Sequence, residues 1–428
     1  MLHRLEYTQS QRRERTPAPA GLRERIDSTK VRRQIVSHCA VRGGSNIEVI
    51  GKHMRRWDIF CRVVDNFGDI GVCWRLVQQL ANEYSLEVRL WVDDLSSFSR
   101  LCPQVVVEAA EQHVGNVEIR RWGADFPAVE VADVVVEAFA CELPSSYLAA
   151  MGQREVAPVW INLEYLSAED WVEDCHRLAS PRAGSLPTKY FFFPGFTPRT
   201  GGLLRERDLL TTRAAYDAAA AAELWNSLGM PPASPEEIRI SLFCYENTAL
   251  PELLKWWSQG PYAIRLLVTP GAAQEQVARW FGQEFSGAAP LEAGLLQAHA
   301  LPFLPQAMFD QLLWACDVNF VRGEDSFVRA QWAQRPFVWQ IYPQAENAHL
   351  VKLDAFLGRY VENLRAPGAA DAVRRCWQAW NFDGDIGAAC QDFLANRQSI
   401  EQHGKVWASQ LDQAGNLANN LVCFVNGT

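Results

Sequence analysis

The 428-residue sequence lacks any long apolar run, any C-x-x-C pair, any G-x-G-x-x-G fingerprint and any phosphate-binding loop with its lysine. Without the roughly 20 consecutive apolar residues that cross a bilayer, it is not an integral membrane protein with spanning helices. Hydrophobic residues make up 48% and charged residues 21%. This balance is typical of globular proteins and excludes a mainly disordered chain, a collagen and a coiled-coil rod.

The 11 cysteines are odd in number and scattered. They therefore indicate neither a disulfide scaffold nor a zinc ribbon, and they favour reduced thiols in the cytoplasm. The histidines are isolated, and His176, His299 and His349 have no ligand-like spacing. We therefore predict no metal site and no cofactor. Cys244 lies in an apolar strand-like segment, where a small core residue is expected rather than a nucleophile.

Charge is unevenly distributed along the chain. Residues 1–56 hold 13 Lys+Arg and 5 Asp+Glu, a net of +8, which leaves a net of −17 for the other residues. Residues 1–53 have no sustained apolar period and cannot bury enough surface to offset their ordering entropy. We interpret them as a disordered basic extension or leader, with Met54 as the natural start. A transit peptide or a nucleic-acid-binding tail is the alternative that this composition leaves open.

Strand-like and helix-like segments alternate after this extension, which predicts parallel sheets covered by helices. A Pro-rich stretch at 231–235 is a candidate linker, and the alternation restarts beyond it. We therefore predict two doubly wound, Rossmann-like domains facing a cleft, at 54–233 and 234–408, followed by a terminal helix at 409–428 that returns to the first domain. The expected strands are 57–64, 86–92, 117–122, 133–140, 159–164, 190–193, 238–245, 264–268, 317–321 and 337–341. The expected helices are 70–84, 213–228, 250–259, 272–281, 305–315 and 326–333, and the chain is expected to be helical almost throughout after 347.

The segment 65–71 (DNFGDIG) lies between the first expected strand and the first expected helix. Ligands of such sheets bind at the carboxyl ends of the strands, and the glycines allow the backbone to approach a ligand closely. Asp65 and Asp69 are four residues apart here. Asp69 is either the N-cap of the helix that follows or a base that points into the cleft.

The run 322–326 (RGEDS) follows another apolar strand and opens a helix. Ser326 is a plausible N-cap, the helix start is a plausible anion site, and Arg322 can bind phosphate oxygens through two hydrogen bonds. This pattern is similar to the diphosphate site of GT-B glycosyltransferases. A capped surface helix is the structural alternative. Glu324 and Asp325 alone make a poor divalent-metal site.

Several segments together resemble one family, the EarP protein-arginine rhamnosyltransferases, from residue 57 to the C-terminus. They are 57–61 (WDIFC), 64–71 (VDNFGDIG), 91–94 (WVDD), 162–167 (NLEYLS), 192–196 (FFPGF), 200–203 (TGGL), 241–246 (SLFCYE) and 322–326 (RGEDS). The resemblance implies a GT-B enzyme of the cytoplasm that transfers rhamnose, with inversion, from dTDP-β-L-rhamnose to one arginine of translation elongation factor P. The modified factor then relieves ribosome stalling at proline runs. No nucleic acid, membrane, metal or cofactor is implied.

The resemblance also implies roles for individual residues. Asp69 corresponds to the general base, Asp65 to its companion, and Glu324 to a further catalytic residue. Contacts to dTDP-rhamnose are implied for Phe67, Gly68, Asp69, Ile70, Tyr245, Gln306, Arg322, Gly323, Glu324, Asp325 and Ser326.

Two other functions remain open at this point. A GT-B transferase could act on a small molecule or a glycan, because fold alone does not define the acceptor. A non-catalytic partner of the translation machinery could retain the fold without the transfer. The net charge of −17 fits an acidic cleft that attracts a basic partner, but it fits equally well a protein that is kept soluble by its charge.

Overall fold

The computed structural model describes residues 56–65, 67–232, 234–287, 289–343 and 348–428. The predicted extension at 1–53 lies outside the described residues. Among the described helices, none is both long and apolar enough to span a bilayer.

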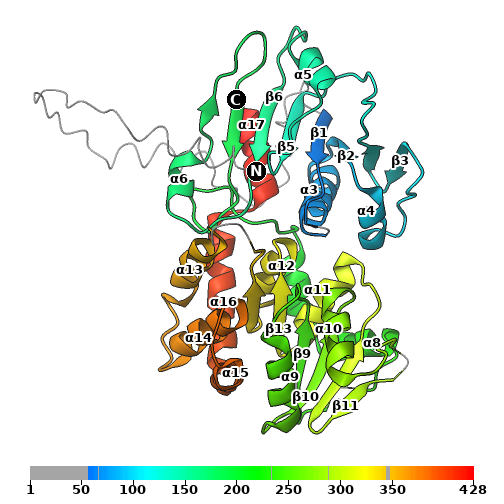
Figure 1. The fold of residues 1–428 in the computed structure, drawn as a ribbon. Helices are drawn as coiled ribbons and strands as arrows, with labels where there is room; N and C mark the ends of the chain where they lie inside the picture. Colours follow the sequence, from blue (N-terminus) through cyan, green and yellow to red (C-terminus); the bar gives the residue numbers. More distant parts are fainter. Residues whose placement is uncertain (1–55, 66, 233, 288, 344–347) are drawn as a thin grey trace, which may run out of the picture. The chain divides into compact units, whose positions relative to one another are not determined.

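The first sheet has eight strands in the order β3-β4-β2-β1-β5-β6-β8-β7 (Figure 1). All its neighbouring strands are parallel except for the edge strands β3 and β7, which pair antiparallel. The strands are β1 (Arg56–Cys61), β2 (Glu87–Val92), β3 (Glu111–Val114), β4 (Val117–Arg121), β5 (Val134–Ala138), β6 (Val159–Leu163), β7 (Ala179–Ser180) and β8 (Lys189–Phe192). Strands β5 and β6 are buried along their whole length, as expected for the centre of a parallel sheet covered on both faces.

The second sheet has six strands in the order β11-β12-β10-β9-β13-β14, and only β11 runs antiparallel. Its strands are β9 (Glu237–Leu242), β10 (Ala263–Val268), β11 (Leu291–Ala293), β12 (Leu296–Ala300), β13 (Val318–Arg322) and β14 (Phe337–Gln340). In each sheet, the early strands are added on one side of the first strand, and the later strands are added on its other side. Such a reversal of strand order is where doubly wound sheets bind ligands.

The helices lie between and after the strands. They are α3 (Gly68–Tyr84), α4 (Leu95–Leu101), α5 (Ser145–Met151), α6 (Trp171–Cys175), α7 (Leu209–Ala215), α8 (Ala218–Ser227), α9 (Leu250–Gln259), α10 (Ala272–Phe281), α11 (Gln306–Ala315), α12 (Asp325–Ala333), α13 (Ala348–Val361), α14 (Ala369–Asn381), α15 (Ile386–Ala395), α16 (Arg397–Ala414) and α17 (Leu417–Gly427).

The helix predicted at 213–228 is two helices in the structure. Asp217 caps α8 by accepting hydrogen bonds from the N–H groups of Ala219 and Ala220, and its extended backbone ends the preceding turn. A run of alanines hides this break, because alanine favours a helix on both sides of it. The sequence analysis also missed the short strands β3, β7, β11 and β12, whose residues are mostly half-buried or exposed. Strands of this kind have little apolar signal.

We call the eight-stranded sheet with its helices the first half of the molecule, and the six-stranded sheet with its helices the second half. The last helix packs on the first sheet, while α16 before it contacts α12 and α15 of the second half (Figure 1, orange to red). Phe424 of α17 lies edge-on to Tyr190 of β8, with ring centroids 5.3 Å apart. The N–H of Leu417 donates to the carbonyl of Leu203 at 3.0 Å. The break between the two helices is at Gly415, whose φ of +99° suits glycine. The domain limits at 233 and 408 stay predictions.

Candidate active site

The candidate site is built from two turns at the carboxyl ends of central strands. The turn after β1 leads into α3 and carries Asp65 and Asp69. The turn after β13 leads into α12 and carries Gly323 and Glu324. Since β1 lies between β2 and β5, and β13 lies beside β9, each turn is at the point where its sheet reverses strand order. Both turns are therefore where ligand contacts are expected.

Asp69 is buried, with 2% of its surface exposed, and it is not the N-cap of α3. The helix begins at Gly68, so Asp69 lies inside its first turn. Its carboxylate folds back onto the loop and accepts hydrogen bonds from the N–H groups of Val64 (2.8 Å) and Asp65 (3.0 Å). Of the two alternatives for Asp69, the N-cap is therefore wrong. The two bonds hold the carboxylate in one orientation.

Burial raises the pKa of Asp69. The N–H groups of Asp65 and Val64 act in the opposite direction, and so does a hydrogen bond from the side chain of Tyr165. Tyr165 follows β6 and stacks on Phe139, with ring centroids 4.5 Å apart and an angle of 18° between the planes. A carboxylate with a raised pKa and fixed hydrogen bonds suits a base that must hold a proton for part of the reaction.

Asp65 joins the two halves of the molecule. Its Oδ1 lies 3.2 Å from Nη1 of Arg322, and its Oδ2 accepts a hydrogen bond of 2.7 Å from the hydroxyl of Tyr245. The guanidinium of Arg322 also lies over the ring of Tyr245, at 4.2 Å, and over that of Phe243, at 4.5 Å. Among the described residues, Nε of Arg322 has no hydrogen-bond partner. This arginine therefore retains donor capacity for a ligand.

Glu324 is held from the other half. Its Oε2 accepts a hydrogen bond of 3.0 Å from the N–H of Leu166. Burial raises the pKa of Glu324 to about 8, and the negative charge of nearby Asp69 acts in the same direction. The neighbours Tyr165 and Leu166 thus contact the two acidic residues Asp69 and Glu324. At neutral pH the Glu324 carboxyl is mostly protonated.

Ser326 is not the N-cap of α12, contrary to the prediction. The helix begins at Asp325, so Ser326 is its second residue. Its hydroxyl bonds both backbone groups of Arg322: it accepts from the N–H at 3.2 Å and donates to the carbonyl. Gly323 bends the chain with a φ of +64°, and a Cβ there would lie 2.9 Å from Oδ2 of Asp65. The turn is therefore fastened from inside the helix, and glycine is required for its close approach to Asp65.

These turns border an open pocket of about 660 Å³. Seven of the predicted site residues line it: Asp65, Phe67, Gly68, Gln306, Arg322, Asp325 and Ser326. Gln306 spans the two halves, since its Nε2 donates to the carbonyl of Gly71 at 3.0 Å and lies 3.4 Å from Oδ2 of Asp325. Residues from both halves therefore meet at this pocket, which is open to solvent.

Five predicted residues do not line the pocket. Asp69, Tyr245, Gly323 and Glu324 contact or adjoin its walls, as described above. The side chain of Ile70 is fully buried in the core. Glu324 borders a second, smaller cavity of about 270 Å³ with Leu166 and Asp325.

The sequence analysis missed most of the apolar wall. Phe67 meets Phe303 edge-on at 5.1 Å, and Phe243 meets Phe309 edge-on at 5.9 Å. The missed wall residues are Leu101, Phe243, Thr269, Pro270, Pro302, Phe303, Leu304 and Phe309. Aromatic side chains at a pocket wall suit a planar base or a sugar face. They come from several separate segments with no shared motif, so only the SLFCYE segment, which includes Phe243, offered a signal.

Comparisons with known proteins show the family to which the chain belongs. A family model described as "Elongation-Factor P (EF-P) rhamnosyltransferase EarP" matches residues 57–426. A protein-arginine rhamnosyltransferase from Pseudomonas putida is 46% identical over 376 residues, which are 86% of this chain and 98% of that protein. Its counterpart in Pseudomonas aeruginosa is 46% identical over 374 residues, or 87% and 99% of the two chains.

A solved structure gives the same result for the fold. It is described as the structural basis for EarP-mediated arginine glycosylation of translation elongation factor EF-P, and it is 33% identical with a TM-score of 0.61. The alignment covers 87% of this chain and 99% of that one. The GT-B class expected from the sequence is thereby confirmed. The chain belongs to the EarP family of elongation factor P rhamnosyltransferases.

Proposed function

We propose that this chain transfers L-rhamnose from dTDP-β-L-rhamnose to a single arginine of elongation factor P, with inversion at the anomeric carbon. The observation that carries the proposal is the meeting of Asp65, Asp69 and Arg322 beside one open pocket. Two carboxylates suit a guanidinium acceptor, and an arginine suits the diphosphate of the donor. The modified factor then relieves ribosome stalling at proline runs, which places the reaction in the cytoplasm.

The acceptor is a difficult nucleophile. A guanidinium keeps its charge because its pKa exceeds about 12, and its nitrogen lone pairs are delocalised. Asp65 pairs with the guanidinium and turns one nitrogen toward the sugar. Asp69 accepts the proton that this nitrogen loses as the C–N bond forms. Two backbone N–H groups already orient the Asp69 carboxylate beside the pocket-lining residue Asp65.

The donor half stabilises the leaving group. Negative charge builds on the dTDP diphosphate as the bond to the anomeric carbon breaks, and Arg322 lies beside the pocket to receive it. The aromatic wall holds the thymine and keeps water away from the reacting carbon. Glu324, mostly protonated at neutral pH, can donate a hydrogen bond to the sugar or to Asp69. Attack from the face opposite the leaving group inverts the centre.

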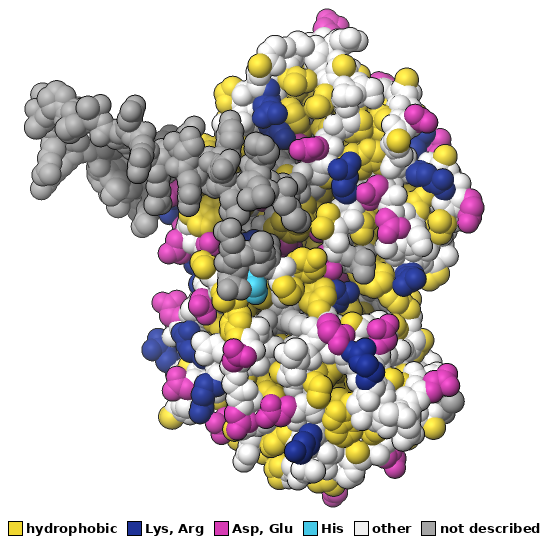
Figure 2. All heavy atoms as spheres, viewed as in Figure 1, with side chains coloured by type: hydrophobic (Ala, Val, Ile, Leu, Met, Phe, Trp, Pro, Cys, Tyr) yellow, Lys and Arg dark blue, Asp and Glu magenta, His cyan; other side chains and the backbone are white. Residues whose placement is uncertain are grey.

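The net negative charge of the residues after 56 is only weak support for the proposal of a basic partner. On the face drawn in Figure 2, Lys and Arg side chains are interspersed with Asp and Glu, so the negative charge does not gather in one patch there. The acceptor is therefore assigned on Asp65, which lines the pocket, and Asp69, which adjoins it, and net charge contributes at most to the rate of encounter.

The test is the intact mass of elongation factor P after incubation with this protein and dTDP-β-L-rhamnose. We expect a gain of one deoxyhexose, mapped to one arginine, and its loss with Asp69→Asn. Release of dTDP without a mass gain would move the search to another acceptor, such as a small molecule or a glycan. Binding of elongation factor P without any dTDP release would favour a non-catalytic partner. Loss of transfer in EDTA, restored by Mg²⁺ or Mn²⁺, would contradict the prediction that no metal is needed.

A further inference from the structure

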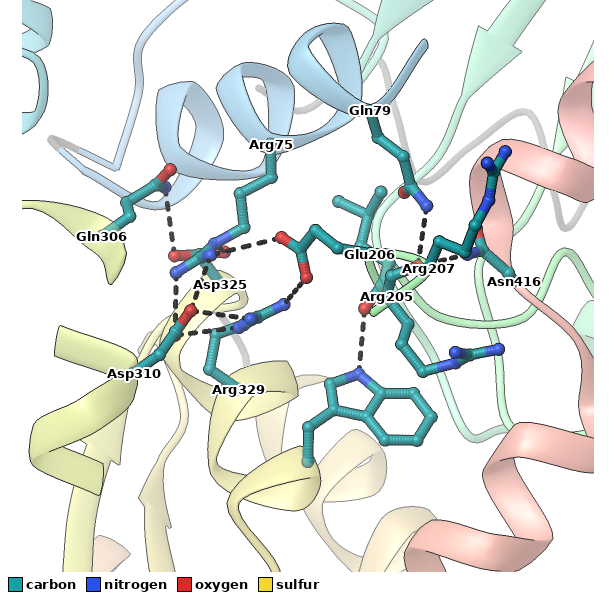
Figure 3. A network of polar contacts seen from close by, with 12 residues as sticks. Arg75, Gln79, Arg205, Glu206, Arg207, Gln306, Asp310, Asp325, Arg329 and Asn416 are labelled. Atoms are coloured by element: carbon teal, nitrogen blue, oxygen red, sulfur yellow. Dashed lines mark hydrogen bonds and ion pairs between the residues drawn. The ribbon is translucent and has the colours of Figure 1, made fainter. Parts of the chain in front are cut away.

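A buried cluster of charged side chains joins the first half of the molecule to the second, next to the pocket. Its five members are Arg75 of α3, Glu206 of the segment before α7, Asp310 of α11, and Asp325 and Arg329 of α12 (Figure 3). Arg75, Asp310 and Arg329 each expose 5% of their surface or less. The sequence analysis singled out only Asp325 among them.

Both arginines bind the same carboxylate. Nη1 and Nη2 of Arg75 each lie 3.0 Å from an oxygen of Asp310, and Arg329 reaches the same two oxygens at 2.9 and 2.6 Å. Each arginine also contacts Glu206, at 3.5 Å from Arg75 and 2.7 Å from Arg329. The two arginines therefore make nearly the same contacts with Asp310 and Glu206.

The electrostatics favour the charged forms of the two arginines and of Glu206, whereas burial raises the pKa of Asp325. Burial opposes the charge of Arg75, and so does its neighbour Arg329, but the three carboxylates outweigh them and raise the pKa of Arg75. Burial alone would raise the pKa of Glu206, yet Arg329 and Arg75 lower it to about 2. Two cations and three carboxylates therefore share one buried site, in which each charge has a partner.

Among the described residues, Arg75 is the arginine of the cluster that bonds Asp325, the cluster member that lines the pocket. Its Nε donates a hydrogen bond of 2.8 Å to Oδ1 of Asp325, as the dashed lines of Figure 3 trace. In the part of the chain that the structure describes, Arg329 makes no hydrogen bond or ion pair with Asp325, although its positive charge acts to lower the pKa of Asp325. Asp325 lines the pocket, and its second oxygen, Oδ2, faces Gln306 at 3.4 Å. One carboxylate oxygen is thus held by Arg75, while the other faces Gln306, which also lines the pocket.

We propose that Arg75 is a positioning residue for donor binding: it fixes the Asp325 carboxylate so that Oδ2 and Gln306 together meet the hydroxyl groups of the donor. The inference rests on the proposed function, since it assigns the pocket to dTDP-rhamnose. A guanidinium suits the task because its planar fork reaches Asp325 through Nε and Asp310 through Nη1 and Nη2 at once. A lysine, which offers a single point charge, cannot span both.

The position of Arg75 also connects Asp325, at the pocket wall, to the helix that carries Asp69. Asp69 and Arg75 lie on the same helix, and a Cβ at Gly71 between them would come within 3.4 Å of Cβ of Asp325. Helix α3 and the start of α12 are therefore in close contact at this point. Through Arg75, the orientation of the donor-binding carboxylate is linked to the helix that carries the proton acceptor.

The test compares Arg75→Gln with Arg329→Gln. Both variants break the bonds to Asp310 and Glu206, so we expect similar decreases in Tm, but only Arg75→Gln releases Asp325. The dissociation constant for dTDP, by calorimetry, and the KM for dTDP-rhamnose are measured for each. In Arg75→Gln we expect the dissociation constant for dTDP, the KM for dTDP-rhamnose, or both to rise about tenfold. In Arg329→Gln we expect both quantities to rise by less than about twofold. Arg75→Lys should recover part of the Tm but little of the donor affinity.

A double variant isolates the route through Asp325. If Arg75 acts by holding this carboxylate, Arg75→Gln should cost no further donor affinity in an Asp325→Asn background. Equal donor losses in the two arginine variants, or undiminished losses in that background, would overturn the positioning role. Failure of the proposed function is seen separately, in the wild-type protein: no dTDP binding removes the donor assignment, and dTDP binding without transfer removes the acceptor assignment.

Discussion

Asp65 and Arg322 form an ion pair of 3.2 Å across the two halves of the molecule, with 18% and 10% of their side-chain surfaces exposed. The residue expected to hold the acceptor guanidinium thus pairs with a guanidinium of the protein itself. Arg322 is also the residue expected to bind the donor diphosphate. A diphosphate bound to Arg322 would compete with Asp65, so we expect donor binding to release Asp65 for the acceptor.

This relationship predicts thermodynamic coupling between the two substrates. Saturating dTDP should raise the affinity for elongation factor P by a factor on the order of 10, and the factor should raise dTDP affinity equally. Calorimetric titrations in both orders measure this. The coupling should vanish in Asp65→Asn, and also with an elongation factor P whose target arginine is replaced by alanine. An affinity that does not change on addition of dTDP would contradict the competition between Asp65 and the diphosphate.

Tyr165→Phe should change the pH dependence of the reaction. The hydrogen bond from Tyr165 lowers the pKa of Asp69, so its loss raises that pKa, and a base is active only when it is deprotonated. We expect the acidic limb of the kcat profile to move to higher pH, with little change in the KM for the donor. The ring stack with Phe139 is retained in this variant.

The matched control is Tyr147→Phe. The Tyr147 hydroxyl donates to Asp58 in the core of the first half, away from the pocket. Its loss should lower Tm without moving the kcat profile. If both variants move the acidic limb alike, Tyr165 has no special action on Asp69.

Glu324→Gln should stabilise the protein, and more so as the pH rises. The folded-state pKa of Glu324 is about 8, above the ordinary value near 4.5, so the native state binds more protons than the unfolded state between these values. Wild-type stability from this group therefore falls as pH rises from about 4.5 to 8. A glutamine has no proton to lose, so the difference in Tm between variant and wild type should be small at pH 4.5 and largest above pH 8. A constant difference across this range would mean that the pKa is not raised.

Gly323→Ala should impair donor binding through strain at the turn. The φ of +64° costs an alanine about 1–2 kcal/mol, and its Cβ would also lie 3.2 Å from the hydroxyl of Tyr245. We expect a lower Tm and a higher dissociation constant for dTDP. Gly358→Ala is the control, because Gly358 lies in α13, has open space around its Cα and should gain about 0.5–1 kcal/mol in a helix. An unchanged dissociation constant in Gly323→Ala would show that the turn tolerates a side chain.

Much of the fold could be predicted from local patterns. Helices α9 and α10 begin and end where their apolar periodicity and flanking residues place them. Several buried strands also lie within a residue or two of the expected limits, since a continuous apolar run has few alternatives. The N-cap alternative for Asp69 and the plausible N-cap at Ser326 are wrong because both side chains bond backbone groups of the preceding turn, which spacing along the helix does not reveal.

The sequence by itself determined the alternation of strands and helices, the family, and the two turns that carry Asp65, Asp69 and Glu324, because these are encoded in contiguous residues. Only the tertiary structure decided which distant residues meet. Asp65 and Arg322 are separated by 257 positions, and Arg75 and Asp325 by 250. Such pairs form because sheet topology brings separate strand ends and helices together, and the burial of charge then selects partners that local sequence cannot specify.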